Sequence, residues 1–397
     1  MSKSSLNICL IGQKFMGRAH SNAYLKAPKF FDLPAVPLMH TVAAQDRAAL
    51  GEFAARWGWK NISTNWREAL QNPEIHLVDI TAQNHMHREM ALAALQAGKH
   101  VACEKPLAGT LDDARVMRDA AAKHPKSKTF IWWSYRRTPA VALAHQLVKA
   151  GKIGRIYHVR GYYLQDWAGP SVPLIWRFDK KIAGSGSHGD LGAHIIDMAR
   201  FVSGEEITEI DGAITETFVK ERELPSIGSA GGIAGGAKGG KGKMAPVEVD
   251  DATLFLCRFS GGAVGSFEAT RFSTGYQNKN GVEIHGEKGA VSFNFEDMNH
   301  LSYFDNTTAA KVKGWTKIMV THAPDHPYAH AWWPDAHIIG YEHTFINQAA
   351  DIMMVLGGQQ PTVPLGDFED AFKTQQVLEA VVQSAQQRRP VKISEIR

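Results

Sequence analysis

The first third of the chain alternates short apolar runs with amphipathic segments of helical periodicity. Five apolar runs predict buried strands, at residues 7–11, 38–44, 76–81, 100–103 and 129–133. Four segments between them predict helices, at residues 15–25, 46–57, 85–97 and 111–123. Strands that alternate with helices form a parallel sheet with helices on both faces. Such a sheet binds its ligand at the carboxyl ends of the strands, so we expect a site at that edge.

After about residue 150 the pattern changes to consecutive strand candidates, several of them joined by glycine-containing turns. They predict a large, mostly antiparallel open sheet, with strands at 155–164, 207–218, 253–259, 263–270, 282–285 and 290–295. Two helices, at 339–356 and 367–387, are expected to close the chain. We therefore predict an α/β domain over 1–134 and an α+β domain over 135–397. Within the latter, the glycine-rich stretch 226–243 predicts a flexible loop.

Charge and cysteine content exclude several classes of protein. The 397 residues carry 44 basic and 40 acidic side chains, and no basic run alternates with aromatic residues as a nucleic-acid groove requires. The apolar run near the N-terminus is too short for a signal sequence or a membrane span. Three separated cysteines favour reduced, structural thiols: Cys9, Cys103 and Cys257. We expect a cytoplasmic protein with no nucleic-acid and no membrane partner.

Four histidines lie close together near the end of the chain: His322, His326, His330 and His337. Their spacing is irregular, so we predict no metal site there.

A glycine turn follows the first predicted strand. Gly12 and Gly17 enclose it, and the next helix begins at Phe15 and Met16. Backbone N–H groups at a helix start can hold a pyrophosphate, while Gly17 lets helix and strand approach closely. This strand, turn and helix together predict a Rossmann dinucleotide-binding domain, although Lys14 stands where the middle glycine of the fingerprint is usual.

The end of the second strand bears on the choice between NAD and NADP. An acidic residue at this place usually binds the ribose hydroxyls of NAD. Here Ala44 occupies that register, followed by Gln45 and Asp46. Arg47 nearby would accept a 2′-phosphate, whereas Asp46 reaching back would favour NAD. We therefore predict NAD or NADP as the cofactor, with Gln45 and Asp46 near the ribose.

Polar side chains also follow the third and fourth strands. Thr81, Asn84 and His87 stand after the third strand, where a cofactor must lie. Glu104 and Lys105 follow the fourth strand, and Pro106 predicts an extended approach to the cleft. A lysine there can hydrogen-bond a reacting hydroxyl and stabilise alkoxide charge.

A second chemical element lies at 189–200. As a helix it places Asp190, His194 and Asp197 on one face. A carboxylate one turn before a histidine can orient its ring and tune its basicity. For the oxidation of an alcohol, this predicts His194 as general base, Asp190 as its partner and Lys105 as electrostatic anchor. A solvated helix face is the alternative for Asp190 and His194 taken alone.

Four segments together resemble the Gfo/Idh/MocA oxidoreductase family: 12–17, 104–106, 135–140 and 189–197. The resemblance runs through both predicted domains. It implies a Rossmann domain, a large open sheet that often forms oligomer contacts, and Lys105, Asp190 and His194 as the catalytic set. It also implies that Glu104 and Lys105 border the cofactor.

Within that family, segments 160–167, 176–178 and 182–186 resemble members that oxidise a hydroxyl of 1,6-anhydroglucose with NAD. This resemblance implies that Tyr135, Gln165 and Trp167 line the sugar site with Lys105, Asp190 and His194. Trp176 and Arg177 would border the nicotinamide. The chain departs from those members at Lys14, Ala44 and His343, where glycine, an acid and glutamate are usual.

The predicted function is therefore an NAD(P)-dependent dehydrogenase that oxidises a secondary hydroxyl of a sugar, anhydrosugar or inositol. Two alternatives use the same residues or the same fold. One is an NAD-dependent enzyme that cleaves glycosides through transient C3 oxidation, and the other is a non-catalytic dinucleotide or sugar sensor. A homo-oligomer, dimer or tetramer, is expected through the C-terminal sheet.

Overall fold

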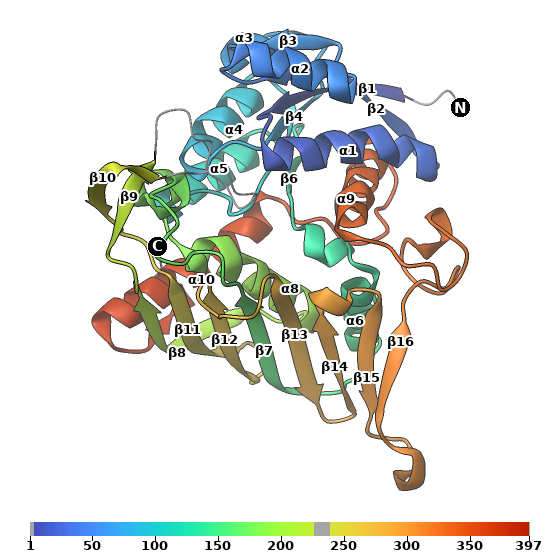
Figure 1. Cartoon of the computed structure of the whole chain (residues 1–397). Coiled ribbons are helices and arrows are strands. Elements are labelled where there is room, and N and C mark those ends of the chain that lie inside the picture. The colour runs from blue at the N-terminus through green and yellow to red at the C-terminus, as the bar shows by residue number, and fades with distance from the viewer. Residues whose placement is uncertain (1–3, 226–238, 397) are drawn as a thin grey trace. The chain divides into compact units, whose positions relative to one another are not determined.

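The chain folds into two compact units in the computed structural model, which describes residues 4–225 and 239–396. One unit comprises Met1–Thr138 with His322–Phe372, and the other comprises Pro139–Thr321 with Lys373–Arg397 (Figure 1). Within the described ranges, no helix has the length and apolar content needed to cross a bilayer.

The first unit is built on a six-stranded parallel sheet in the order β3-β2-β1-β4-β5-β6. Its strands are β1 (Ser4–Ile11), β2 (Ala35–Ala43), β3 (Asn61–Ser63), β4 (Leu77–Ile80), β5 (His100–Cys103) and β6 (Thr129–Ile131). Its helices are α1 (Phe15–Phe30), α2 (Arg47–Trp57), α3 (Trp66–Leu70), α4 (His87–Gln96), α5 (Leu111–Lys123) and α9 (Tyr341–Leu356). This strand order is that of a Rossmann fold, so the predicted class is confirmed.

Some elements of this unit differ from the prediction. Helix α1 continues past Leu25 and through Pro28, because Phe31 N–H closes its last turn on the carbonyl of Ala27 at 3.0 Å. The sequence analysis missed β3 and α3, of three and five residues, since elements so short carry little periodicity.

The second unit contains a nine-stranded sheet in the order β16-β15-β14-β13-β7-β12-β11-β8-β17. All neighbours are antiparallel except β7 and β12, which confirms the predicted open sheet. The strands are β7 (Ile156–Leu164), β8 (Ile207–Glu216), β11 (Ala252–Phe259), β12 (Val264–Thr270), β13 (Lys279–Gly286), β14 (Gly289–Asn294), β15 (His300–Asp305), β16 (Trp315–Met319) and β17 (Val391–Lys392). Sequence analysis missed β15 to β17, which lie at the two edges of the sheet.

Two helices cover one face of this sheet. Helix α8 (Ala193–Ser203) contacts β7 and β13, and α6 (Pro139–Lys149), which the sequence analysis missed, contacts β14 and β15 (Figure 1). Along β11 buried and exposed positions alternate, so its exposed side chains lie on the other face of the sheet. A last helix, α10 (Phe368–Gln387), runs from the first unit into the second.

The predicted flexible loop at 226–243 falls mostly outside the described residues, since 226–238 are not described. Its last residues form the beginning of β10 (Gly239–Pro246). Strand β10 pairs with β9 (Glu221–Pro225) in a separate two-stranded sheet.

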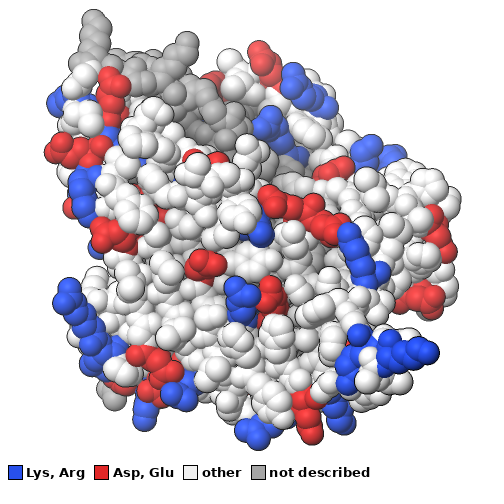
Figure 2. All heavy atoms as spheres, turned by 60° about the horizontal axis from the view of Figure 1, so that its bottom comes forward, with Lys and Arg blue, Asp and Glu red and all other residues white. Residues whose placement is uncertain are grey.

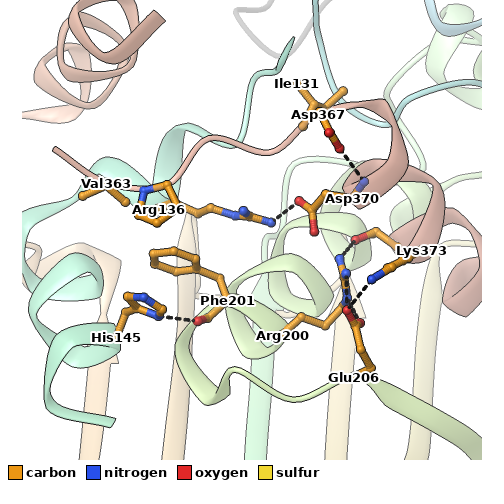
Figure 3. Close-up of polar contacts among 12 residues, drawn as sticks. Ile131, Arg136, His145, Arg200, Phe201, Glu206, Val363, Asp367, Asp370 and Lys373 are labelled. Carbon is orange, nitrogen blue, oxygen red and sulfur yellow. Dashed lines mark hydrogen bonds and ion pairs between the residues drawn. The ribbon is translucent and has the colours of Figure 1, made fainter. Parts of the chain in front are cut away.

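Polar contacts hold helix α8, which carries part of the candidate site (Figure 3). Arg200, at the end of α8, donates from Nε to Oε2 of Glu206 at 2.6 Å, and Lys373 Nζ lies 3.1 Å from the other oxygen. Burial alone would raise the pKa of Glu206, but these two cations lower it below its usual range. His145 Nδ1 on α6 lies 2.7 Å from the carbonyl oxygen of Phe201, which joins α6 to α8.

Candidate active site

Two glycines shape the turn between β1 and α1. A Cβ at Gly12 would lie 2.3 Å from Oγ1 of Thr81, and Gly12 has a φ of +120°. A Cβ at Gly17 would lie 2.4 Å from the carbonyl oxygen of Gly12. Thr81 itself, at the end of β4, donates its hydroxyl to the carbonyl of Ile11 at 2.9 Å. The turn therefore has no room for side chains at either glycine, as a backbone cradle for phosphate requires.

The first turn of α1 has no side-chain cap. Its N-cap, Lys14, makes no side-chain capping hydrogen bond, and the first turn carries no acidic residue. Phe15 is exposed and stacks on Tyr341 at a centroid distance of 6.5 Å, while Met16 is half-buried. An uncapped helix start beside a glycine cradle fits the pyrophosphate of NAD. Direct contacts of NAD with Gly12, Phe15, Met16 and Gly17 stay a prediction.

The residues after β2 are exposed. Oδ1 of Asp46 accepts hydrogen bonds from the N–H groups of Ala48 and Ala49, both at 3.1 Å, so Asp46 caps α2. Gln45 is exposed beside it. Contacts of Gln45 and Asp46 with the ribose of the cofactor stay a prediction.

Thr81, Asn84 and His87 lie on the segment after β4. Thr81 and Asn84 are half-buried, whereas His87 is fully buried. The His87 ring places Nε2 3.1 Å from the carbonyl of Ala82 and Nδ1 3.2 Å from that of Pro106. Burial lowers the pKa of His87 despite these carbonyls. The ring thus links the segments after β4 and β5, and its predicted cofactor contact remains untested.

Glu104 and Lys105 follow β5 directly. Glu104 is 6% exposed, and its Oε2 accepts the backbone N–H of Lys105 at 3.1 Å. Lys105 is half-buried, and the peptide bond to Pro106 is cis. The strand end therefore holds the lysine backbone through its neighbour's carboxylate.

Tyr135 lies in a 3₁₀ turn at Ser134–Arg137 and is 4% exposed. Helix α9 holds this turn, because Asn347 donates to the carbonyl of Arg137 at 3.0 Å. Arg136 adds an ion pair to Oδ2 of Asp370 at 2.6 Å (Figure 3). These contacts hold the two residues that follow Tyr135.

In the second unit, the predicted helix at 189–200 is interrupted. Residues His188–Gly192 form a π-helical turn that runs into α8. The Asp250 carboxylate accepts from the N–H of Gly186 at 2.8 Å, the N–H of His188 at 2.7 Å and the Ser187 hydroxyl at 2.6 Å. Such π turns occur frequently at functional sites, and this one carries Asp190.

Two guanidinium groups hold the carboxylate of Asp190. Arg271 Nη2 lies 2.9 Å and Arg177 Nη1 3.1 Å from its Oδ2. Arg271 is 1% exposed and also donates to the carbonyl of Gly186 at 3.1 Å. His194, on the first turn of α8, is 9% exposed, and its ring lies 6.0 Å from that of Tyr163. The pairing of Asp190 with His194 stays a prediction.

The structure brings two predicted sugar-binding residues together. Nε1 of Trp167 donates to Oε1 of Gln165 at 2.7 Å, and Nε2 of Gln165 donates to Asn278 at 2.9 Å. The Cζ of Arg271 lies 5.2 Å from the centre of the Trp167 ring. Trp176 is half-buried beneath the guanidinium of Arg177, at 4.5 Å. Gln165 and Trp167 thus belong to one cluster with Arg271, which also holds Asp190.

Sequence reasoning missed Arg271 and Asp250. Arg271 is a lone basic residue after a strand, and Asp250 is one of two adjacent aspartates before a strand; neither belongs to a motif that distinguishes it from a surface charge. Across residues 4–225 and 239–396, no three metal-ligating side chains form a metal-binding group. His322 pairs with Asp335 at 3.3 Å.

Comparisons with known proteins agree with this architecture. Residues 6–130 match the family model described as "Oxidoreductase family, NAD-binding Rossmann fold", and residues 141–292 match "GFO/IDH/MocA C-terminal domain". The chain is 41% identical over 395 residues to levoglucosan dehydrogenase of Pseudarthrobacter phenanthrenivorans, with 99% of each protein covered.

Two solved structures are similar along their full length. An oxidoreductase domain protein from Kribbella flavida is 44% identical, with a TM-score of 0.91 over 98% of this chain and 99% of that one. A levoglucosan dehydrogenase in complex with NADH and levoglucosan is 39% identical, with a TM-score of 0.90 over 98% of this chain and 100% of that one.

The fold, the glycine cradle and the comparisons together identify the protein as an NAD-dependent oxidoreductase that acts on CH–OH groups. The chain belongs to the Gfo/Idh/MocA family. The predicted resemblance, including that to the anhydrosugar-oxidising members, is confirmed.

Replacing Gly17 with Ala should weaken NADH binding about tenfold or more, because the added Cβ meets the carbonyl of Gly12 at 2.4 Å. Gly51→Ala is the matched control, since Gly51 lies on α2 with nothing within 4 Å of its added Cβ. Titration of NADH fluorescence measures both dissociation constants. Equal affinity in G17A and G51A would contradict the cradle.

Arg271→Met should lower the free energy of unfolding by about 3 kcal/mol, because it removes one of the two guanidinium groups that contact the Asp190 carboxylate and one donor to the Gly186 carbonyl. Arg258→Met removes an exposed ion pair to Asp211 on the same sheet and should change it by less than about 0.5 kcal/mol. Urea unfolding measures both values. A loss no larger in R271M than in R258M would show that the buried pair does not stabilise this segment.

Proposed function

We propose that this protein oxidises a secondary hydroxyl of an anhydrosugar, levoglucosan or a close analogue, with NAD. The observation that carries the proposal is the relation to a levoglucosan dehydrogenase along 99% of both chains. A related myo-inositol 2-dehydrogenase and D-glucoside 3-dehydrogenase, at 27% and 28% identity, support oxidation of ring alcohols more generally.

Three residues of this chain carry the chemistry in our proposal. His194 removes the proton from the substrate hydroxyl as general base. Asp190 orients the His194 ring and stabilises its protonated form, while Arg177 and Arg271 keep the Asp190 carboxylate in place. The Lys105 ammonium stabilises the alkoxide charge that develops on the same oxygen. Bound NAD supplies the hydride acceptor.

In our proposal, the residues around Trp167 bind the sugar. An aromatic face can cover the apolar C–H face of a compact bicyclic sugar, and buried amides fix its hydroxyls by hydrogen bonds. Gln165 is 4% exposed and held on both sides by Trp167 and Asn278, so its amide is fixed in orientation. Tyr135 supplies a further polar group in the proposed site.

Purified protein should form NADH from NAD and levoglucosan, with NADP at least about tenfold less effective because the Asp46 carboxylate repels a 2′-phosphate. The absorbance of NADH over time measures this, with a panel of monosaccharides and inositols in parallel. If no compound of the panel yields NADH, the proposal is contradicted. Release of an aglycone from glucosides without net NADH would identify the glycoside-cleaving alternative instead.

Lys105→Met and His194→Gln should each lower kcat by about 10²- to 10⁴-fold, since each removes a group that acts on the reacting hydroxyl. Binding of NADH should stay within about threefold of the original in both variants. Lys60→Met, at an exposed lysine of the same unit as Lys105, should leave kcat unchanged. Full activity in K105M or H194Q would remove that residue from the mechanism.

We also propose a homo-oligomer formed through the open face of the nine-stranded sheet. Large aliphatic side chains lie exposed on neighbouring strands of this face, with Leu254 opposite Ile214 in register and Leu256 two residues further along β11. Figure 2 shows one face of the protein, on which basic and acidic side chains are interspersed among uncharged ones. Contiguous exposed aliphatic side chains are typical of protein interfaces.

The wild-type protein should therefore have a solution mass of at least twice the 43.7 kDa of one chain. Leu254→Glu with Leu256→Glu should shift it toward the monomer, because two carboxylates would be buried unpaired in the interface. Val312→Glu, at a more exposed aliphatic position outside the strands, should leave the mass unchanged. Light scattering after gel filtration measures the three masses, and an unchanged mass in the double variant would place the interface elsewhere.

A further inference from the structure

The first unit contains a buried triad of charged residues formed by His20, Asp79 and Glu104. Their exposed fractions are 0%, 0% and 6%. Nδ1 of His20 lies 2.9 Å from Oδ2 of Asp79, and Nε2 lies 2.9 Å from Oε1 of Glu104. The three residues come from α1, β4 and the segment after β5. One imidazole therefore joins the helix of the glycine cradle to the strand ends beside it.

A carboxylate at each ring nitrogen favours a protonated imidazole. An ionised carboxylate can only accept hydrogen bonds, so a ring with a carboxylate at each nitrogen must donate from both. Burial alone would lower the pKa of His20, but Asp79 and then Glu104 more than offset it and raise the pKa to about 9. The neighbouring Tyr24 and Cys103 stay neutral, because burial raises the pKa of both. Asp79 adds to the rise for Tyr24, and Glu104 and Asp79 add to it for Cys103.

Each carboxylate of the triad uses its second oxygen as well. Oδ1 of Asp79 accepts from Nε1 of Trp132 at 2.9 Å, and Trp132 lies against the His20 ring at a centroid distance of 3.9 Å. Oε2 of Glu104 accepts the backbone N–H of Lys105 at 3.1 Å. A single carboxylate thus connects the His20 charge to the backbone of Lys105.

We propose that protonated His20 is a positioning residue for the oxidation reaction, which holds Glu104 so that Glu104 fixes the backbone of Lys105 beside the dinucleotide cradle. The proposal rests on the proposed role of Lys105. Without the imidazolium, two buried carboxylates lack their shared counter-charge, and Glu104 has no reason to stay in place. A displacement of about 1 Å at a catalytic group can cost on the order of 100-fold in rate.

His20→Gln and His20→Asn test this role, since each keeps one polar donor but cannot bridge both carboxylates. We expect kcat to fall about 10- to 100-fold in both, while the NADH dissociation constant stays within about threefold. His40→Gln is the matched control, because His40 is also buried in this unit, at 6% exposed, and contacts Thr41 and Glu74 rather than the triad. H40Q should retain the wild-type kcat.

A double-mutant cycle with Lys105→Met separates positioning from general structure. If His20 acts through Lys105, H20Q should lower kcat less than about twofold when Lys105 is already Met. An equal loss in both backgrounds would overturn the proposal. If K105M itself keeps full activity, the proposed function fails instead, so the two failures are distinguishable.

The pH dependence of the unfolding free energy tests the charged triad even in a variant that has lost its activity. A group whose pKa is raised on folding contributes its full stabilisation below the unfolded value of 6.5, and this contribution is lost as pH rises through about 9. The unfolding free energy that H20Q loses should therefore be largest near pH 6 and shrink toward pH 10. A loss that does not change with pH would overturn the charged triad.

If neither His20 variant folds, neutron diffraction of the wild-type protein tests the protonation of His20 directly. Deuterium on both ring nitrogens supports the proposal, and deuterium on only one of them overturns it.

Discussion

Carboxylates paired with cations, in buried or largely buried positions, fix the two segments on which the proposed chemistry of this protein depends. In the second unit, Arg271 and Arg177 both contact Asp190, on the π-helical turn that leads into the helix of His194. In the first unit, the buried triad connects His20 to the backbone of Lys105 through Glu104. A buried charge is costly unless it is paired and fully hydrogen-bonded, so these arrangements allow few alternative conformations.

Backbone constraints act together with these charges. Gly12 and Gly17 leave no room for side chains between β1 and α1, and the hydroxyl of Thr81 closes the same turn. Helix α1 therefore starts close to the carboxyl ends of β1 and β4, and three residues after Gly17 it carries His20. The helix whose start we propose to bind NAD thus also carries His20, which contacts Glu104.

Periodicity predicted most of the parallel sheet because its strands are continuous apolar runs, as in β5 at His100–Cys103, where the predicted bounds are those observed. It failed for β15 and β16 at the sheet edge, where few positions are buried. The motif residues Lys105, Asp190 and His194 were identified by spacing and resemblance. Arg271 was not, because its partner Asp190 is 81 residues away in sequence and only the folded sheet brings them together.

The central claim is that Lys105 and His194 act on one substrate oxygen. A crystal structure of the protein with NADH and levoglucosan tests it most directly. Our account predicts Nζ of Lys105 and a ring nitrogen of His194 both within about 3.2 Å of the same sugar hydroxyl. An intact complex in which either group lies beyond the reach of that hydroxyl, even through one water molecule, would contradict it.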